Sequence, residues 1–315
     1  MENQRNSNLN IQASFKEKEE SCNRNFNDGG PFFHLATDGN RQEIIFSDEG
    51  DYKVATNFLA ICFVGIMTRI LAFSLMSNHI HLILEGEKES CLALFNLFKR
   101  KLEYYFKKTG RNGTLSNFSC DEPIPITSLD QLRCEIAYVH RNPFVIHNGI
   151  LPHSYLWGDG HLYFNPLVEL IPARNFKDIP FSEKRAILMG RVSGLPESYL
   201  VRDGYIIPSS FSSYKHGMSF FRDAVHYYSC LNRKQESVSE IAQRLGDKII
   251  LNDEELFPVA SSLSAKMFDQ PQIKALTSSQ KIELAKKLHF SFNASNKQIS
   301  RIIAIDRTIV ESLFS

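Results

Sequence analysis

Between residues 31 and 142 the chain alternates short β-type runs with longer helical runs, and this order limits the folds it can adopt. The β-type runs are five or six residues long, whereas in the longer helical runs apolar residues recur three and four apart. The runs cover residues 32–36, 48–68, 70–75, 79–84, 88–108, 123–127 and 130–142. Strand, helix, two strands, helix, strand, helix predicts an α+β fold with helices on one face of an antiparallel sheet.

The chain as a whole divides into four regions. Residues 1–30 are rich in Asn, Ser, Glu and Lys, which predicts a disordered tail too polar to bury anything. Residues 31–165 form the predicted α+β domain, and 166–235 a connecting region with several turn signals. Residues 236–315 are expected to be helical. Ser237-x-x-Glu240 and Ser295-x-x-Gln298 are capping-box patterns, and Asp306 is positioned to open a last short helix.

Composition and charge exclude several classes of protein. The chain has 315 residues, 43% hydrophobic, with 36 basic and 35 acidic side chains, so its net charge of +1 excludes a uniformly basic nucleic-acid sleeve. The longest apolar run, residues 58–67, is shorter than the ~20 residues of a membrane span, and the N-terminus lacks the apolar segment of a secretory signal. The six cysteines form no CxxC pair. We therefore expect a soluble, cytoplasmic protein with structural thiols and no membrane partner.

The most specific chemical feature of the sequence is the segment Asn78-His79-Ile80-His81-Leu82-Ile83-Leu84. Side chains alternate along a strand, so His79 and His81 are expected on one face and Ile80, Leu82 and Leu84 on the other. Two neighbouring imidazoles can chelate a metal ion. The alternative is a pair of polar strand residues that face solvent.

The last helix of the series carries a second pattern, in Ile136-Ala-Tyr-Val-His-Arg-Asn-Pro143. Tyr138 and Asn142 are four residues apart and so share a helical face, and Pro143 is expected to end the helix. The amide oxygen of Asn142 is a hard ligand suited to Mg²⁺ or Mn²⁺. The alternative is a buried tyrosine and a capping asparagine. His140 lies on a different face from Tyr138 and is expected to be structural or to contact DNA.

Together, the two patterns resemble the single-tyrosine HUH transposases, especially the REP-associated tyrosine transposases. Residues 72–84 are similar to that family's strand motif, and residues 137–143 look like its tyrosine helix. Further similarities lie at Asp38-Gly-Asn-Arg41, Ile45-Phe46, Gly149-Ile150 and Tyr155-x-Trp157. The resemblance covers about residues 31–165. It departs from the family pattern at Leu115-Ser-Asn-Phe-Ser119, where the family often has Phe-x-x-Arg-Phe.

The resemblance implies an HUH domain of ferredoxin-like or RRM-like fold that cuts and rejoins single-stranded DNA at hairpin or repeat sites. His79, His81 and Asn142 would hold one divalent metal ion, Mg²⁺ or Mn²⁺. Tyr138 would attack the scissile phosphate and form a 5′-phosphotyrosine. Four other tyrosines lack the companion residues of Tyr138: Tyr104, Tyr105, Tyr155 and Tyr163.

Two segments are locally basic and are candidate DNA-binding surfaces. Residues 88–112 hold seven basic and two acidic side chains, and residues 281–307 hold six and two. The candidate contacts are Lys99, Arg100, Lys101, Lys107, Lys108 and Arg111 in the first segment and Lys297, Arg301 and Arg307 in the second. The second segment fits a helix-turn-helix that reads DNA. Its alternative is a helical hairpin packed on the core, and for the first segment a solvated helix face.

Two other functions stay open at this stage. The first is a domesticated, non-mobile protein that binds DNA repeats and keeps the fold. The second is a replication initiator or plasmid relaxase, whose HUH motif usually has a different order and spacing. The oligomeric state also stays open, with a homodimer among the options.

Overall fold

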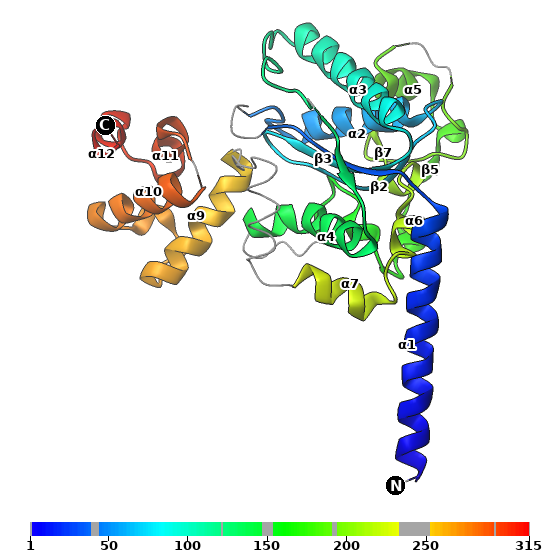
Figure 1. Cartoon of the computed structure of the whole chain (residues 1–315). Coiled ribbons are helices and arrows are strands. Elements are labelled where there is room, and N and C mark those ends of the chain that lie inside the picture. Colours follow the sequence, from blue (N-terminus) through cyan, green and yellow to red (C-terminus); the bar gives the residue numbers. More distant parts are fainter. Residues whose placement is uncertain are drawn as a thin grey trace.

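The computed structural model describes residues 2–38, 44–120, 122–146, 154–190, 194–232, 253–292 and 294–314. Three segments singled out from the sequence lie wholly or partly outside these ranges: the family-like segment at 38–41, the pair Gly149-Ile150 and the capping box at 237–240. The rest of the chain has an α+β architecture around a four-stranded antiparallel sheet, with a helical C-terminal part (Figure 1). The coarse fold class predicted from the sequence is therefore confirmed.

The central sheet consists of β1 (Phe32–Ala36), β2 (Arg69–Leu75), β3 (Ile80–Glu85) and β4 (Ile124–Ile126) in the order β2-β3-β1-β4. β2 and β3 form a hairpin, whose loop is closed by a hydrogen bond from the Met76 N–H to the His79 carbonyl at 2.8 Å. His81 pairs with Ala36 of β1 on one side and with Ser74 of β2 on the other. The register thus places His81 in the interior of the sheet.

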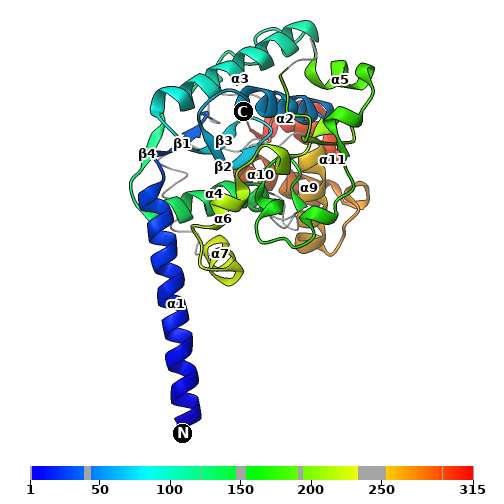
Figure 2. The ribbon, with the colours of Figure 1, turned by 90° about the vertical axis from the view of Figure 1, so that its right-hand side faces the viewer.

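Helices cover both faces of this sheet, not one face as predicted (Figures 1 and 2). On one side lie α2 (Glu49–Phe63) and α3 (Lys88–Lys108), packed on Leu82 and Leu84 of β3. On the other lies α4 (Leu129–Ile146), packed on Ile83. Since side chains alternate along β3, His81 and Ile83 share the α4 face. The central strand β3 is therefore buried on both sides, which the alternation of helices and strands along the sequence did not reveal.

Two helices end at other residues than predicted. α2 stops at Phe63 instead of 68, because Val64 is extended and Gly65 has a φ of 87°. α4 continues through Pro143. A proline removes one backbone hydrogen bond, but α4 is anchored by Leu132, Ile136 and Val139 in the core, and this packing outweighs the loss near the end of the helix.

The N-terminal region is a helix, α1 (Glu2–Asp28), where the composition predicted a disordered tail. It projects away from the sheet and contacts the fold only near its C-terminal end (Figure 2). There Cys22 is buried, Phe26 stacks on Phe32 with ring centroids 5.0 Å apart, and Glu19 binds Arg133 at 2.8 Å. One narrow stripe of contacts therefore joins this polar helix to the fold, against the expectation that it buries nothing.

Residues 154–232 pack onto the α+β core through short elements. These are β5 (Arg174–Asn175), α5 (Phe181–Leu188), β6 (Leu200–Arg202), β7 (Tyr205–Ile206), α6 (Tyr214–Met218), α7 (Ala224–Leu231) and the 3-10 turns η2 (Gly160–Leu162), η3 (Val168–Leu170), η4 (Phe176–Asp178) and η5 (Pro208–Ser210). Val201 and Ile206 join the hydrophobic cluster of α2, and the Ile206 N–H donates to Asn57 on α2 at 2.7 Å. The predicted connecting region is thus folded against the domain before it.

The C-terminal part is helical, as predicted. It contains α9 (Asp253–Phe268), η6 (Ile273–Ala275), α10 (Ser278–Phe292), α11 (Asn296–Ile303) and α12 (Arg307–Leu313), which share one hydrophobic cluster with Met76 and Tyr155. Ser295 and Gln298 form the predicted capping box of α11, and Asp306 caps α12. Among the described residues, no helix combines the length and apolar character needed to cross a bilayer.

Candidate active site

Three predicted site residues, His79, His81 and Tyr138, meet between the central sheet and α4, and Asn142 lies one helical turn beyond Tyr138. His81 lies on β3, and His79 lies immediately before that strand. Tyr138 and Asn142 lie on α4, one turn apart on the face that packs against the sheet. All four side chains are at most 4% exposed. The structure thus brings together residues that are about sixty positions apart in the sequence.

The two histidines of the HxH pattern are neighbours. Their ring centroids are 4.9 Å apart with the ring planes nearly perpendicular, and both residues are fully buried. This burial excludes the alternative that they are polar residues facing solvent. Nδ1 of His79 lies 2.8 Å from Oδ1 of Asn78. Because an amide oxygen only accepts, Nδ1 carries the proton and Nε2 carries the lone pair of a neutral His79.

His81 belongs to a buried hydrogen-bond relay that the sequence analysis missed. Nδ1 of His81 lies 3.0 Å from Nε2 of His34 on β1, and Nδ1 of His34 lies 2.8 Å from a carboxylate oxygen of Glu135 on α4. A carboxylate accepts, so His34 donates through Nδ1 and, when neutral, accepts through Nε2. His81 then donates through Nδ1, which makes Nε2 its lone-pair atom. In both histidines of the motif, metal ligation would therefore use Nε2.

Tyr138 packs edge-to-face against two of these rings. Its ring centroid is 5.5 Å from that of His81 and 6.2 Å from that of His34. Such aromatic pairs contribute ~1 kcal/mol each and fix the orientation of the ring. Tyr138 is 2% exposed. In this state the phenol is therefore held beside the histidines and covered by protein.

Asn142 has a buried amide nitrogen with no hydrogen-bond partner among the described residues. Such a group costs ~1–3 kcal/mol, and native structures usually avoid it. Rotation of the amide by half a turn would place the oxygen at the same position, where it can bind a cation. Two imidazoles and an amide oxygen form a donor set suited to Mn²⁺, so these residues fit a divalent metal ion. No group of three or more His, Cys, Asp or Glu side chains in the described ranges has the arrangement of a metal site.

His140 has a structural role, one of the two alternatives given above. Its Nε2 lies 3.0 Å from Asp159 and its Nδ1 lies 2.9 Å from the hydroxyl of Tyr227, and all three residues are buried. Asp159 also accepts hydrogen bonds from the Phe73 N–H at 2.8 Å and from the Ser212 hydroxyl. The network ties α4 to β2, α7 and the segment around residue 159, and so fixes the rotation of the helix that carries Tyr138.

The sequence did contain weak signals for the two residues that were missed. Glu135 precedes Tyr138 by three positions and Asn142 by seven, the spacing of one helical face. His34 is the one polar residue of the strand Phe32–Ala36. Neither signal identifies a partner, because only the pairing of β1 with β3 and the packing of α4 bring His34 between Glu135 and His81.

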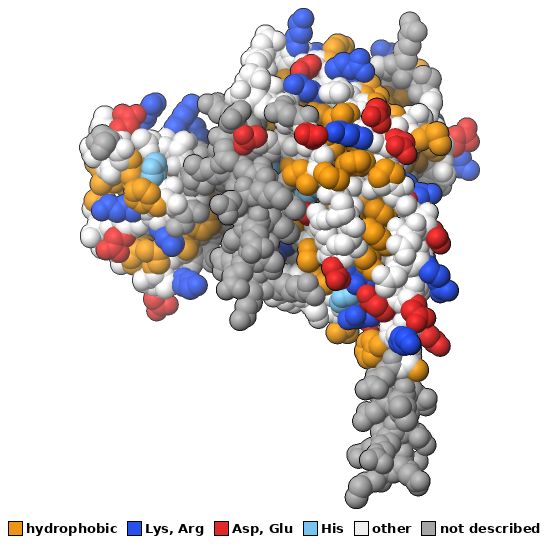
Figure 3. Space-filling model, in the orientation of Figure 1, with side chains coloured by type: hydrophobic (Ala, Val, Ile, Leu, Met, Phe, Trp, Pro, Cys, Tyr) orange, Lys and Arg blue, Asp and Glu red, His pale blue; other side chains and the backbone are white. Residues whose placement is uncertain are grey.

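The predicted DNA-binding cations of residues 88–112, on α3 and in the loop after it, differ in their surroundings. Arg111 pairs with buried Asp51, and Lys99 lies 4.0 Å from Glu103. Within the described part of the chain no carboxylate lies within 4.0 Å of Arg100, Lys101, Lys107 or Lys108. Figure 3 shows Lys and Arg side chains intermixed with Asp and Glu on the visible face over α3, not one continuous basic surface.

In the C-terminal part, two of the three predicted contacts are engaged in ion pairs. Arg301 binds Asp253 at 2.7 Å, and Arg307 binds Glu311 at 2.7 Å. Lys297 is exposed. α11 and α12 are joined by a short turn in which Ala304 has a φ of 54°, and both helices pack on the common cluster. This geometry suits a helix-turn-helix and a plain helical hairpin alike.

Comparison with protein-family models, with curated proteins and with solved structures returned no match. Function is therefore inferred from the residues and their geometry.

Proposed function

We propose that this protein is a metal-dependent single-stranded DNA endonuclease and strand transferase of the single-tyrosine HUH transposase type. The observation that carries the proposal is the packing of Tyr138 against His81 and His34, with Asn142 one turn further along the same helix. Metal-ligating histidines of known sites donate their second ring nitrogen to a carboxylate, carbonyl or similar acceptor. The relay from His81 through His34 to Glu135 has this form.

The strand order supports the same assignment. β1, α2, β2, β3, α3 and β4 follow one another as β-α-β-β-α-β, and the sheet order β2-β3-β1-β4 places β1 and β3 in the middle. This order of elements is the one expected of a ferredoxin-like fold, and it supports the proposal. α4 is an addition on the open face of the sheet, which is where an HUH domain would need its tyrosine helix.

In the proposed reaction, Oη of Tyr138 attacks the phosphorus of a DNA phosphodiester and forms a 5′-phosphotyrosine, which joins the tyrosine to the 5′ end of the downstream strand. The P–O3′ bond breaks, and the phenolic proton is transferred to solvent or to the departing 3′ oxygen, which leaves as a hydroxyl. His79, His81 and Asn142 would hold Mg²⁺ or Mn²⁺, which would polarise the phosphate and neutralise developing charge. The bond energy retained in the phosphotyrosine allows a second 3′-hydroxyl to attack and rejoin the strand.

The substrate would be single-stranded DNA next to a hairpin or repeat. The exposed cations Arg100, Lys107 and Lys108 and the exposed Lys297 have no acidic partner in the described part of the chain, so each can contact phosphate. Because Tyr138 is 2% exposed, DNA access requires that the segments covering it move.

A covalent-adduct assay tests the proposal. The full-length protein is incubated with Mn²⁺ and labelled single-stranded oligonucleotides from the DNA flanking its gene, and adducts are resolved on a denaturing gel. We expect an adduct with the wild type and with Tyr228→Phe, an exposed tyrosine outside the site, and none with Tyr138→Phe. An adduct that survives in Tyr138→Phe would refute the assignment of the nucleophile.

The burial of Tyr138 favours a second candidate, a non-mobile protein that binds DNA repeats with the same fold. That protein would bind hairpin DNA with equal affinity in the wild type and in Tyr138→Phe, and would form no adduct in either. The same gel, combined with a binding measurement, therefore separates the two functions.

A further inference from the structure

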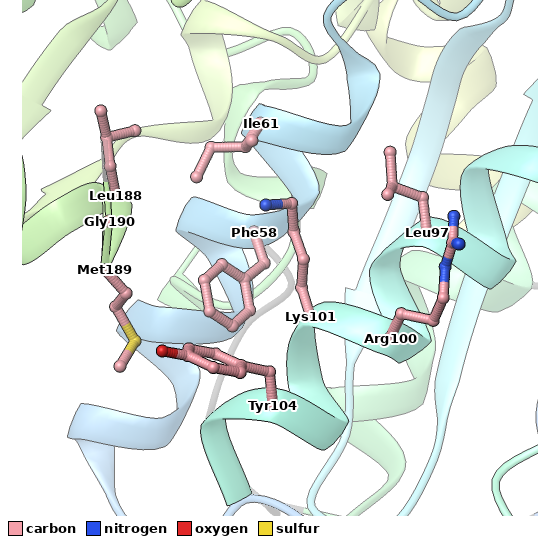
Figure 4. A pocket seen from close by; sticks show the side chains of 9 residues that line it. All are labelled: Phe58, Ile61, Leu97, Arg100, Lys101, Tyr104, Leu188, Met189 and Gly190. Carbon is pink, nitrogen blue, oxygen red and sulfur yellow. The ribbon is translucent and has the colours of Figure 1, made fainter. Parts of the chain in front are cut away.

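A pocket of about 420 Å³ lies between α2, α3 and the end of α5, away from the candidate active site (Figure 4). Its lining combines apolar and cationic side chains: Phe58, Ile61, Leu97, Arg100, Lys101, Tyr104, Leu188, Met189 and Gly190. α2 and α3 cover the sheet face opposite α4, so the sheet separates this pocket from Tyr138. Its volume falls within the range of small-molecule sites, ~300–1,000 Å³.

Lys101 brings a positive charge into the pocket. Its side chain is partly buried, and Nζ lies over the ring of Phe58, 5.6 Å from the ring centroid. Figure 4 shows its amino group between Phe58 and Ile61. Within the described ranges no carboxylate lies within 4.0 Å of this amino group. Burial raises the pKa of the nearby Cys62 thiol to about 12, so Cys62 stays neutral and cannot balance the charge of Lys101.

The other side of the pocket offers an aromatic ring. Tyr104 is 56% exposed and lines the pocket, with its hydroxyl directed toward Met189 (Figure 4). Arg100 lies on the opposite rim, next to Leu97. An anion stabilises an ammonium group among apolar side chains through a charge-assisted hydrogen bond, and a planar apolar group stabilises the exposed Tyr104 ring by covering it.

We propose that this pocket binds a small anion with a planar apolar body, the anionic group at Lys101 and the planar group against Tyr104. Two sources share this chemistry, an aromatic carboxylate and a nucleoside monophosphate. The pocket lies apart from the proposed site of DNA cleavage, because none of its residues belongs to the relay or to α4. Lys101, predicted from the sequence to contact DNA, would here serve a small ligand, and Arg100 on the rim is shared with the proposed DNA surface.

Isothermal titration calorimetry on the full-length protein tests this site. The probes are 1-naphthoate with its neutral analogue 1-naphthalenemethanol, and adenosine monophosphate with adenosine and inorganic phosphate. We expect at least one of the two aromatic anions to bind at least tenfold more tightly than its neutral analogue, and more tightly than phosphate. The anion that binds identifies the source.

Variants then locate the binding. Lys101→Gln should lower the affinity for the anion at least tenfold, and Tyr104→Ala should lower it several-fold. Lys101→Arg should retain most of the affinity. Lys108→Gln removes the same charge from α3 outside the pocket and should have no effect. If Lys101→Gln does not fold, the Tyr104→Ala and Lys101→Arg results decide.

Several results would overturn the proposal. The first is that neither aromatic anion binds. The second is that the neutral analogues, or phosphate, bind as tightly as the aromatic anions. The third is that Lys101→Gln and Lys108→Gln lower the affinity for the anion equally. Loss of single-stranded DNA affinity in Lys101→Gln without any anion binding would make the pocket a DNA contact instead. The adduct assay is independent of all these outcomes.

Discussion

Replacement of Glu85 by Gln is expected to destabilise the protein strongly at neutral pH and weakly in acid. Glu85 ends β3 and is 5% exposed. Its carboxylate accepts hydrogen bonds from the Gly30 N–H at 3.2 Å and from Arg69 at 2.8 Å, and lies 2.9 Å from Nε2 of His216. Burial alone would raise the pKa of this carboxyl group, but His216, Gly30 and Arg69 together lower the pKa from 4.5 to about 2.

The difference between the two pKa values sets the size of the effect. The pKa of Glu85 is about 2 in the folded protein and 4.5 in the unfolded chain, and each pKa unit corresponds to ~1.4 kcal/mol, so the ionised carboxylate contributes about 3 kcal/mol to the unfolding free energy at pH 7. Because the folded pKa is the lower one, the contribution is complete above pH 4.5 and is lost as the pH falls from 4.5 toward 2. Gln cannot ionise, so Glu85→Gln resembles the protonated wild type at every pH.

Urea denaturation followed by circular dichroism measures the effect. Glu85→Gln should lower the unfolding free energy by about 3 kcal/mol at pH 7 and by only about 1 kcal/mol at pH 3, where the wild-type carboxylate has already lost most of its stabilising effect. Glu103→Gln is the matched control, because Glu103 is exposed and its helical pair with Lys99 contributes ~0.5 kcal/mol or less. Equal losses at both pH values, or a loss below ~1 kcal/mol at pH 7, would refute the reasoning.

Three further predictions address packing, metal binding and DNA binding. Gly217→Ala should lower the unfolding free energy by about 2 kcal/mol in thermal melts, because a Cβ there would lie 1.8 Å from the hydroxyl of buried Tyr163. Gly190→Ala, whose Cβ would meet no atom of the described residues closer than 3.8 Å, should lower the unfolding free energy less. Glu135→Gln should weaken Mn²⁺ binding about 10–100-fold by calorimetry, and unchanged affinity would argue against the relay. Lys297→Ala should lower the salt slope of DNA binding by about one unit; an unchanged slope would favour a helical hairpin.

Much of the secondary structure could be predicted from the sequence because it depends on local periodicity and capping. α3 has the predicted bounds, and α11 begins at the predicted capping box. The end of α4 could not be predicted, because packing on the core carries this helix through Pro143. The helix α1 could not be predicted either, because amino-acid composition does not indicate its contacts with the rest of the fold.

The sequence by itself determined the α+β class, the alternation that separates His81 from Leu82 on β3, and the shared helical face of Tyr138 and Asn142. These follow from the periods of two residues in strands and 3.6 in helices, which are properties of the backbone. Only the tertiary structure decided which groups meet.

The relay from His81 through His34 to Glu135 joins three elements, and it exists because β1 pairs with β3 while α4 packs over both. The pocket around Lys101 likewise needs α5 against α2 and α3. Contacts between distant segments depend on strand order and helix packing, which no local pattern encodes.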